Sequence, residues 1–314
     1  MKYAYFPGCS QESTAEEYNR SLQAVARRLE GAELVEIPAW NCCGATPAAT
    51  VDPALPHALA ARNLAIAEEM AAAEGREMEV VAPCAACYKN LRKASHVLRD
   101  DPEMLARVNA AMEDHQLGYA PTVRHPLDVV VNDVGVDNVP VEKPLHGLKV
   151  ASYYGCLLTR PEGGFDDPER PQSMDRLMAA LGAEAVDWAY KTKCCGGAIY
   201  MTEEEISFKM SADVLAHAKA AGANAVAVGC PFCQLMLDLY QDRLEAIKHT
   251  TFDMPIFFFS QLMGLAMNLD RADLGLDKLV VPPFELLART VDAPESGKKP
   301  KKKRAAKLKR WGEG

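Results

Sequence analysis

The cysteines are the residues of this 314-residue chain that could do chemistry. All ten fall into two copies of one pattern, C-x32-CC-x40-CxxC and then C-x37-CC-x34-CxxC. Thiolates are soft ligands that select iron–sulfur clusters, zinc or copper(I). Each copy therefore predicts a metal centre. The first set is Cys9, Cys42, Cys43, Cys84 and Cys87, and the second is Cys156, Cys194, Cys195, Cys230 and Cys233.

Five cysteines per copy exceed what the common sites need. A structural zinc takes four ligands, and a cubane cluster takes four thiolates. Neighbouring cysteines seldom direct both sulfurs at one metal, so the Cys-Cys pairs favour a polynuclear centre whose irons they share. One alternative stays open: a cysteine in each half is a spare thiol, and the other four bind zinc or an ordinary cluster.

Other redox and catalytic motifs are missing. The sequence has no C-x2-C-x2-C-x3-C run of the ferredoxin type and no GxGxxG turn between a strand and a helix. Electrons must therefore come from another protein. The seven histidines are scattered without metal-site or protease spacing, and we expect them in the core or on the surface, with His125 as the exception.

The sequence contains an internal repeat. Gly8-Cys9 matches Gly155-Cys156, and the two Cys-Cys pairs and the two CxxC pairs match as well, at offsets of 147, 152 and 146 residues. Three landmarks at nearly constant offset indicate an internal duplication. Glycines beside the cysteines suit sharp turns and close approach of the backbone to a ligand. These glycines are Gly8, Gly44, Gly155, Gly196 and Gly197.

The elements between the landmarks alternate in type. Short β-branched runs predict strands, and 3.6-residue periodicity predicts helices. Alternation predicts an α/β fold with mostly parallel sheets, whose carboxyl edges gather the cysteines. Each CxxC pair would open a helix, whose N–H groups favour thiolate charge. Expected strands are 33–37, 78–81, 225–228 and 255–259, and expected helices are 15–30, 54–74, 101–116, 173–181, 203–221 and a final one capped by Ser260.

We expect two similar domains related by a pseudo-twofold axis, with Gly8-Cys9 opposite Gly155-Cys156 across a cleft. The predicted segments are a first domain at 1–100, a helical connection at 101–147, a second domain at 148–290 and a basic, disordered tail at 291–314. Two domains of this size are long enough for separate cores.

Charge and hydropathy limit the partners and the location that we expect for this protein. The net charge is −8, but nine Lys and Arg residues lie within 298–310, so the body is strongly acidic and should repel nucleic acid. The tail is either solvated or attached to an acidic partner. No run approaches the roughly 18 apolar residues of a membrane span, and no signal-peptide core is present. We therefore expect a cytoplasmic protein, in which thiols stay reduced and a disulfide framework is disfavoured.

Segments outside the cysteines point to one family. These are 124–128 (RHPLD), 154–161 (YGCLLTRP) and 187–197 (DWAYKTKCCGG). With both cysteine motifs, they resemble the CCG-domain family, and most nearly the B subunits of heterodisulfide reductases. The likeness covers nearly all of residues 1–260, whereas the basic tail departs from it.

The resemblance implies a function. Each half would hold a noncubane [4Fe–4S] cluster on its five cysteines, and a mixed disulfide bound between the clusters would be cleaved reductively, or formed in reverse. A ferredoxin-like partner that carries [4Fe–4S] clusters would deliver electrons, and a flavin-containing partner would lie beyond it in the complex. Two alternatives remain: a relative in sulfur oxidation or sulfate respiration that acts on another thiol, disulfide or persulfide, and a purely electron-transferring subunit.

Overall fold

The computed structural model describes residues 1–45, 48–161 and 163–293. Most of the predicted basic tail, 291–314, lies outside the described residues. The ten cysteines are all described, and all are free thiols.

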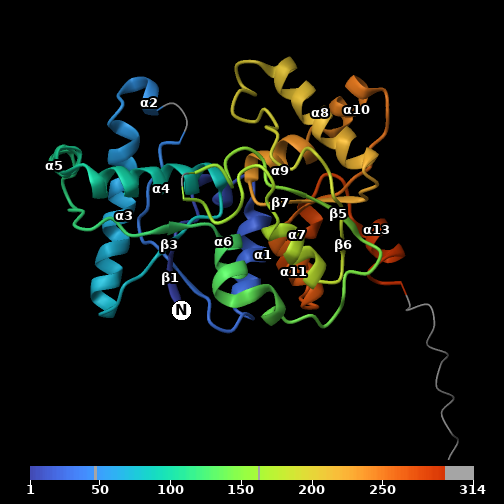
Figure 1. Ribbon diagram of the computed structural model, residues 1–314, viewed down its shortest axis with the longest axis horizontal. Coiled ribbons are helices and arrows are strands. Elements are labelled where there is room, and N and C mark those ends of the chain that lie inside the picture. The colour runs from blue at the N-terminus through green and yellow to red at the C-terminus, as the bar shows by residue number, and fades with distance from the viewer. Residues whose placement is uncertain (46–47, 162, 294–314) are drawn as a thin grey trace, which may run out of the picture.

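Two four-stranded sheets form the framework (Figure 1), and every strand pairing in them is parallel. The first sheet has the order β2-β1-β3-β4 and the second the order β6-β5-β7-β8, so the second copy repeats the topology of the first. The α/β fold with two parallel sheets is confirmed. The strands are β1 Lys2–Tyr5, β2 Glu33–Glu36, β3 Val80–Val81, β4 Val123–Arg124, β5 Lys149–Tyr153, β6 Glu184–Ala185, β7 Ala225–Val228 and β8 Ile256–Phe258.

Helices connect the strands, as parallel pairing requires. The first half contains α1 Glu16–Ala26, α2 Ala48–Val51, α3 Leu55–Glu74, α4 Ala85–Asp100, α5 Pro102–Ala111, α6 Pro126–Asp128, the π-helix η2 Val129–Gly135 and the 3-10 helices η1 Cys9–Glu12 and η3 Val136–Asn138. The second half contains α7 Ser173–Ala180, α8 Glu204–Ala220, α9 Pro231–Asp238, α10 Gln241–Lys248, α11 Phe259–Ala266, α12 Arg271–Leu274, η4 Leu276–Lys278 and α13 Phe284–Arg289.

Two expectations about elements need correction. The segment 101–147, expected as a helical connection, contributes β4, which pairs with β3 and completes the first sheet. Ser260 does not cap a final helix: α11 begins at Phe259, Ser260 lies buried in its first turn against Ser21, and α12, η4 and α13 follow. The division into domains at the expected boundaries stays a prediction.

The halves pack reciprocally. Helix α1 of the first half packs against α11, which follows the last strand of the second half, and α7 packs against α6 and η3, which follow the last strand of the first. Figure 1 shows α1 beside α11, among the elements of the second half. Equivalent helices exchanging equivalent partners is the arrangement expected of a pseudo-twofold axis.

Two cores follow from this packing. Alternate β1 residues point to opposite faces: Ala4 joins a core beneath α3 and α4, whereas Tyr3 and Tyr5 join a larger core shared by both halves. In the shared core Tyr18 of α1 stacks on Phe258 of β8, with ring centroids 4.0 Å apart. The interface between the halves is therefore packed with apolar side chains, like a domain interior.

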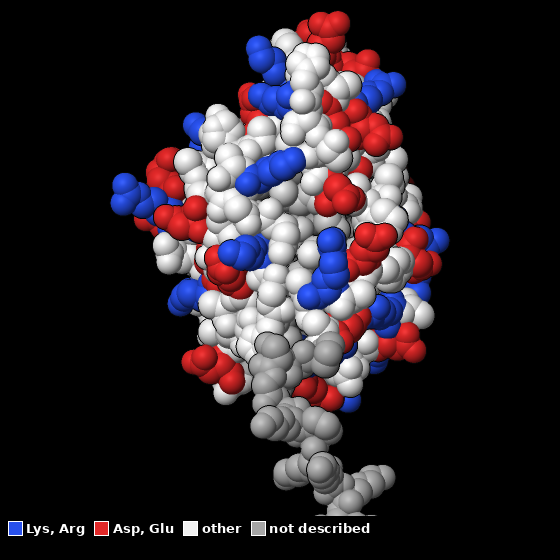
Figure 2. Space-filling model, turned by 90° about the vertical axis from the view of Figure 1, so that its right-hand side faces the viewer, with Lys and Arg blue, Asp and Glu red and all other residues white. Residues whose placement is uncertain are grey.

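One face of the molecule carries side chains of both charges. Acidic and basic side chains are interspersed on the face in Figure 2. Within the described residues, no helix combines the length and hydropathy that crossing a bilayer requires.

Candidate metal centres

The CxxC turns stand at the carboxyl ends of the central strands. Cys84 follows β3 and is the N-cap of α4, and Cys230 follows β7 and is the N-cap of α9. Both N-cap residues have extended backbone, so their side chains lie beside the first helical turn, where Cys87 and Cys233 follow. The free N–H groups of such a turn favour negative charge on sulfur.

In the first half all five cysteines are connected by contacts between thiols. The sulfurs of Cys43 and Cys87 lie 3.2 Å apart. Hydrogen bonds also join Cys9 to Cys42, Cys42 to Cys43 and Cys84 to Cys87. The hydrogen bond from Cys87 lowers the pKa of Cys43, so this thiol is biased toward the thiolate that metals bind. The pair Cys9 and Cys42 is exposed, and the other three are buried.

The second half repeats this arrangement. Cys195 and Cys233 lie 3.6 Å apart between sulfurs, and hydrogen bonds join Cys156 to Cys194 and Cys230 to Cys233. The hydrogen bond from Cys156 lowers the pKa of Cys194 to about 6. Three of the four pairs of the first half thus recur in the second, so the duplication preserved most of the sulfur geometry as well as the order of the cysteines.

The two sets of cysteines also touch each other. The thiols of Cys84 and Cys230, both buried, interact across the interface between the halves closely enough that each shifts the pKa of the other. The CxxC turns make this contact, and the expectation that Gly8-Cys9 lies opposite Gly155-Cys156 across a cleft stays a prediction. The two candidate centres are thus adjacent.

Glycines bring the backbone close to the sulfurs. Gly8 and Gly155 have φ of +74° and +66°, and a Cβ there would lie 3.2 Å from the Cys87 sulfur and 3.1 Å from the Cys233 sulfur. A side chain would therefore be strained and would crowd a cysteine thiol. Gly44 and Gly196 also have positive φ, and the N–H groups of Gly196 and Gly197 donate to the sulfurs of Cys194 and Cys195 at 3.3 and 3.4 Å.

A buried ion pair supports the turn that carries Cys156. Lys191 Nζ lies 2.7 Å from Asp175 Oδ1, and the Tyr154 hydroxyl donates to Asp175 Oδ2 at 2.7 Å. The Lys191 carbonyl accepts hydrogen bonds from the N–H groups of Tyr154 and Gly155. Tyr154 and Lys191 lie within the segments that carry the family resemblance, but no pattern in the sequence indicated that they meet Asp175, because the three are distant along the chain.

A small cavity opens beside the second set. Its volume is about 90 Å³, and its lining combines the five cysteines of the second half with Tyr154, Phe232 and, from the first half, Ala45, Ala85 and Ala86. The lining apart from sulfur is mostly apolar, so a molecule held there would be shielded from water. This cavity lies where the two halves meet.

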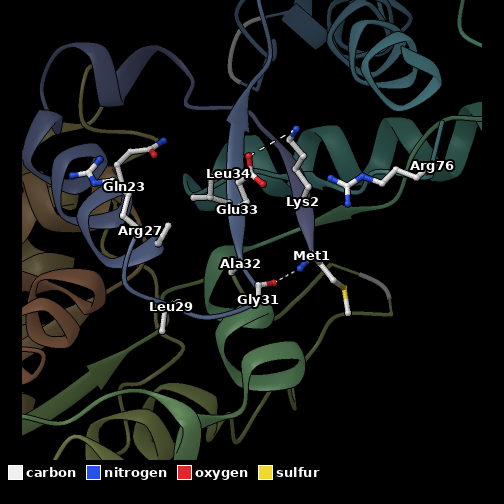
Figure 3. Close-up of a pocket in the computed structure, with 11 residues that line it drawn as sticks. Met1, Lys2, Gln23, Arg27, Leu29, Gly31, Ala32, Glu33, Leu34 and Arg76 are labelled. Carbon is white, nitrogen blue, oxygen red and sulfur yellow. Dashed lines mark hydrogen bonds and ion pairs between the residues drawn. The ribbon is translucent and has the colours of Figure 1, made fainter. Parts of the chain in front are cut away.

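A larger pocket, of about 440 Å³, lies elsewhere (Figure 3). It surrounds the amino ends of β1 and β2, and its described lining includes Lys2, Arg27 and Arg76 but no cysteine. Ligands of parallel sheets gather at the opposite, carboxyl edge. We therefore assign the candidate site to the cysteines.

Orphaned polar atoms test whether the cysteine sets fit an iron–sulfur centre. Four buried side-chain polar atoms have no hydrogen-bond partner among the described residues, and they belong to Gln11, Tyr18, Ser152 and Thr159. Gln11 lies in the turn after Cys9 and Thr159 in the turn after Cys156, while the Tyr18 hydroxyl is close enough to Cys84 and Cys230 for their charges to raise its pKa further, after burial itself. Cluster sulfides accept such hydrogen bonds, so the donors fit.

Single-ion coordination is not preformed. Among residues 1–45, 48–161 and 163–293, no three His, Cys, Asp or Glu side chains are grouped as one ion would require. The sulfur contacts are instead pairwise, as described above.

Removing the Tyr18 hydroxyl should be tolerated by the cluster-free chain. Tyr18→Phe keeps the ring stacked on Phe258 and removes an unpaired buried hydroxyl, so we expect the free energy of unfolding to be unchanged or to rise by about 1 kcal/mol. Urea unfolding of the metal-free protein measures this free energy of unfolding. Tyr154→Phe, which removes a hydroxyl bonded to Asp175, is the control and should be destabilising. A loss in Tyr18→Phe as large as in the control would mean that the hydroxyl has a partner within the chain.

Comparison with known proteins identifies a matching family and similar proteins. The family model described as a cysteine-rich domain (CCG) matches twice, at residues 3–92 and 150–238. The 8-methylmenaquinol:fumarate reductase membrane anchor subunit of Wolinella succinogenes is 34% identical over 91% of this chain and 99% of its own. The B subunit of a ferredoxin/F420H2-dependent CoB-CoM heterodisulfide reductase from Methanosarcina acetivorans is 31% identical over 92% of this chain and 96% of its own.

A solved structure supports the fold. The crystal structure of a hypothetical protein from Helicobacter pylori superposes with a TM-score of 0.69 at 15% identity, over 89% of this chain and 51% of that one. The two relatives above are subunits of reductases, which supports an oxidoreductase role, and the resemblance to heterodisulfide reductase B subunits is confirmed. With both halves matched by the family model, the chain belongs to the cysteine-rich domain (CCG) family and carries two copies of the domain.

Proposed function

We propose that this chain is the catalytic iron–sulfur subunit of a heterodisulfide reductase-like complex, in which a disulfide is cleaved or formed between two noncubane [4Fe–4S] clusters. The supporting observation is the contact between Cys84 and Cys230, which makes the two five-cysteine sets neighbours. Cleaving a disulfide takes two electrons and two protons and yields two thiols. Two adjacent one-electron donors suit that stoichiometry, because a lone sulfur radical is avoided.

The chain's own residues would prepare the site. When bound, the clusters would supply one electron each and irons that can hold sulfur. The ten cysteines would ligate them, and the amino ends of α4 and α9 would stabilise the negative charge of the thiolates. The apolar lining of the cavity, including Phe232, would exclude water and strengthen these electrostatic interactions.

Partners follow from the same proposal. The chain carries no ferredoxin motif of its own, so a ferredoxin-like partner with [4Fe–4S] clusters would deliver electrons, and a flavin-containing partner would belong to the wider complex. The similarity to a B subunit of a reductase complex supports this assignment.

A second candidate is an electron-transferring subunit without a substrate of its own. Similarity to the membrane anchor subunit of 8-methylmenaquinol:fumarate reductase, over 99% of that protein, favours it. Burial of six of the ten cysteines and the small size of the cavity are compatible with this role. Electrons from a quinol would then cross this chain to a partner.

Metal analysis under strict anoxia tests the proposal. We expect roughly eight irons and eight acid-labile sulfides per chain after reconstitution, four of each per half. Turnover is then measured with an artificial one-electron donor and organic disulfides. Zinc in each half without labile sulfide would contradict both candidates. Full clusters that exchange electrons with a quinol analogue but leave every disulfide intact would favour the second.

A further inference from the structure

His125 lies buried between the two halves, at the N-cap of α6. Its Nε2 is 2.9 Å from the carbonyl oxygen of Pro83 and 3.1 Å from that of Gly229. These two residues hold equivalent places in the duplication, since each directly precedes the first cysteine of its CxxC pair. One side chain thus contacts both cysteine turns.

The ring is fixed in one tautomer and one orientation. The Leu127 N–H donates to Nδ1 at 3.2 Å, so Nδ1 carries no proton, and the proton on Nε2 is shared by the two carbonyls. Phe165 stacks on the ring at 6.4 Å between centroids. Gly229 permits the approach, because a Cβ there would lie 3.1 Å from His125 Cε1.

The second copy has no such donor. Arg124 of β4 pairs with Val81, and Phe257 of β8 pairs with Ala227, so the residues that follow, His125 and Phe258, are equivalent. Both are N-caps of the next helix, but the Phe258 ring stacks on Tyr18, and a phenyl side chain has no hydrogen-bond donor. One copy of the fold therefore forms without this donor, and the bond from the donor to Gly229 runs between the copies.

We propose that His125 is a positioning residue that clamps the two CxxC turns together and so sets the distance between the two metal centres. Its bonds end one residue before Cys84 and Cys230, whose thiols meet. The consequence for catalysis rests on the proposed function: two donors that act on one disulfide must keep a fixed spacing, and small misplacements cost large factors in rate.

The test compares four variants of the full chain. His125→Phe copies the residue of the second half, His125→Asn is too short to reach the carbonyls, and His125→Gln keeps N–H donors at the distance of Nε2. His115→Gln, at a histidine paired with Glu69 away from the site, is the control. Hydrogen exchange with mass spectrometry follows segments 84–90 and 230–236.

We expect at least tenfold faster exchange in both segments for the Phe and Asn variants, partial recovery for Gln, and no change in α10 or in the control. In reconstituted protein of unchanged iron content, the spin–spin interaction between the centres should weaken in the same order, and kcat should fall more than KM changes. If the His125→Phe variant fails to fold, the comparison is made between the His125→Asn and His125→Gln variants.

Unchanged exchange, faster exchange in one turn only, or uniform loosening of the whole chain would overturn the clamp. If the wild type binds no iron or sulfide, the proposed function fails, yet hydrogen exchange still decides the clamp.

Discussion

Replacing either Cys84 or Cys230 by serine should abolish disulfide-dependent turnover, although each change damages only one half. Under the proposed function, serine removes a soft ligand, and the remaining centre can supply one electron where the cleavage needs two. The double variant should lose no more activity than either single variant, because groups that act as a unit show strongly non-additive losses. Steady-state assays with an artificial one-electron donor measure all three variants.

The untouched half provides the internal control. Each single variant should retain roughly four irons and its secondary structure, since the sheet cores carry most of the stability of domains this size. Circular dichroism and iron analysis check both points. Substantial turnover in either variant would refute a shared disulfide and would favour the electron-transferring function.

Local pattern predicted the regular elements well. The helix-like stretches at 54–74 and 203–221 correspond to α3 and α8, because both are rich in alanine and other strong helix formers. The two-residue strand β4 was missed. Val123 and Arg124 are strand only because β3 lies beside them, and pairing between distant segments leaves no local pattern.

The candidate site, too, was predictable from the sequence only where the signal is local. Cysteine type and spacing were sufficient to propose ten ligands and to locate them at strand ends. The contact of Cys84 with Cys230 depends on how the halves dock, and the orphaned hydroxyl of Tyr18 depends on helix α1 entering the other half. His125 stood out only as an isolated histidine in a distinctive segment, and its two carbonyl partners are 42 and 104 residues away.

Gly196→Ala is expected to be the most damaging single substitution among the glycines with positive φ considered next. Its φ is +82°, and a Cβ would lie 2.7 Å from the Cα of Ser207 in α8, which is backbone that cannot rotate away. Conformational strain costs roughly 1–2 kcal/mol and overpacking roughly 1–3 more. Ser207 and Ser211 also donate to the carbonyls of Gly196 and Cys195, so displacing α8 would loosen the Cys-Cys turn.

Substitutions at two other glycines separate the cost of backbone strain from the cost of steric overlap. Gly222 has φ of +87° with nothing within 4 Å, so Gly222→Ala should show the strain alone. Gly44, the counterpart of Gly196 in the first half, meets the end of the flexible Leu59 side chain at 2.9 Å, and Gly44→Ala should be intermediate. Urea unfolding of metal-free protein ranks the three variants, and iron analysis should show loss from the second centre in Gly196→Ala only. Equal destabilisation by all three would mean that contact with α8 does not hold the Cys194-Cys195 turn, and that the glycine serves backbone conformation alone.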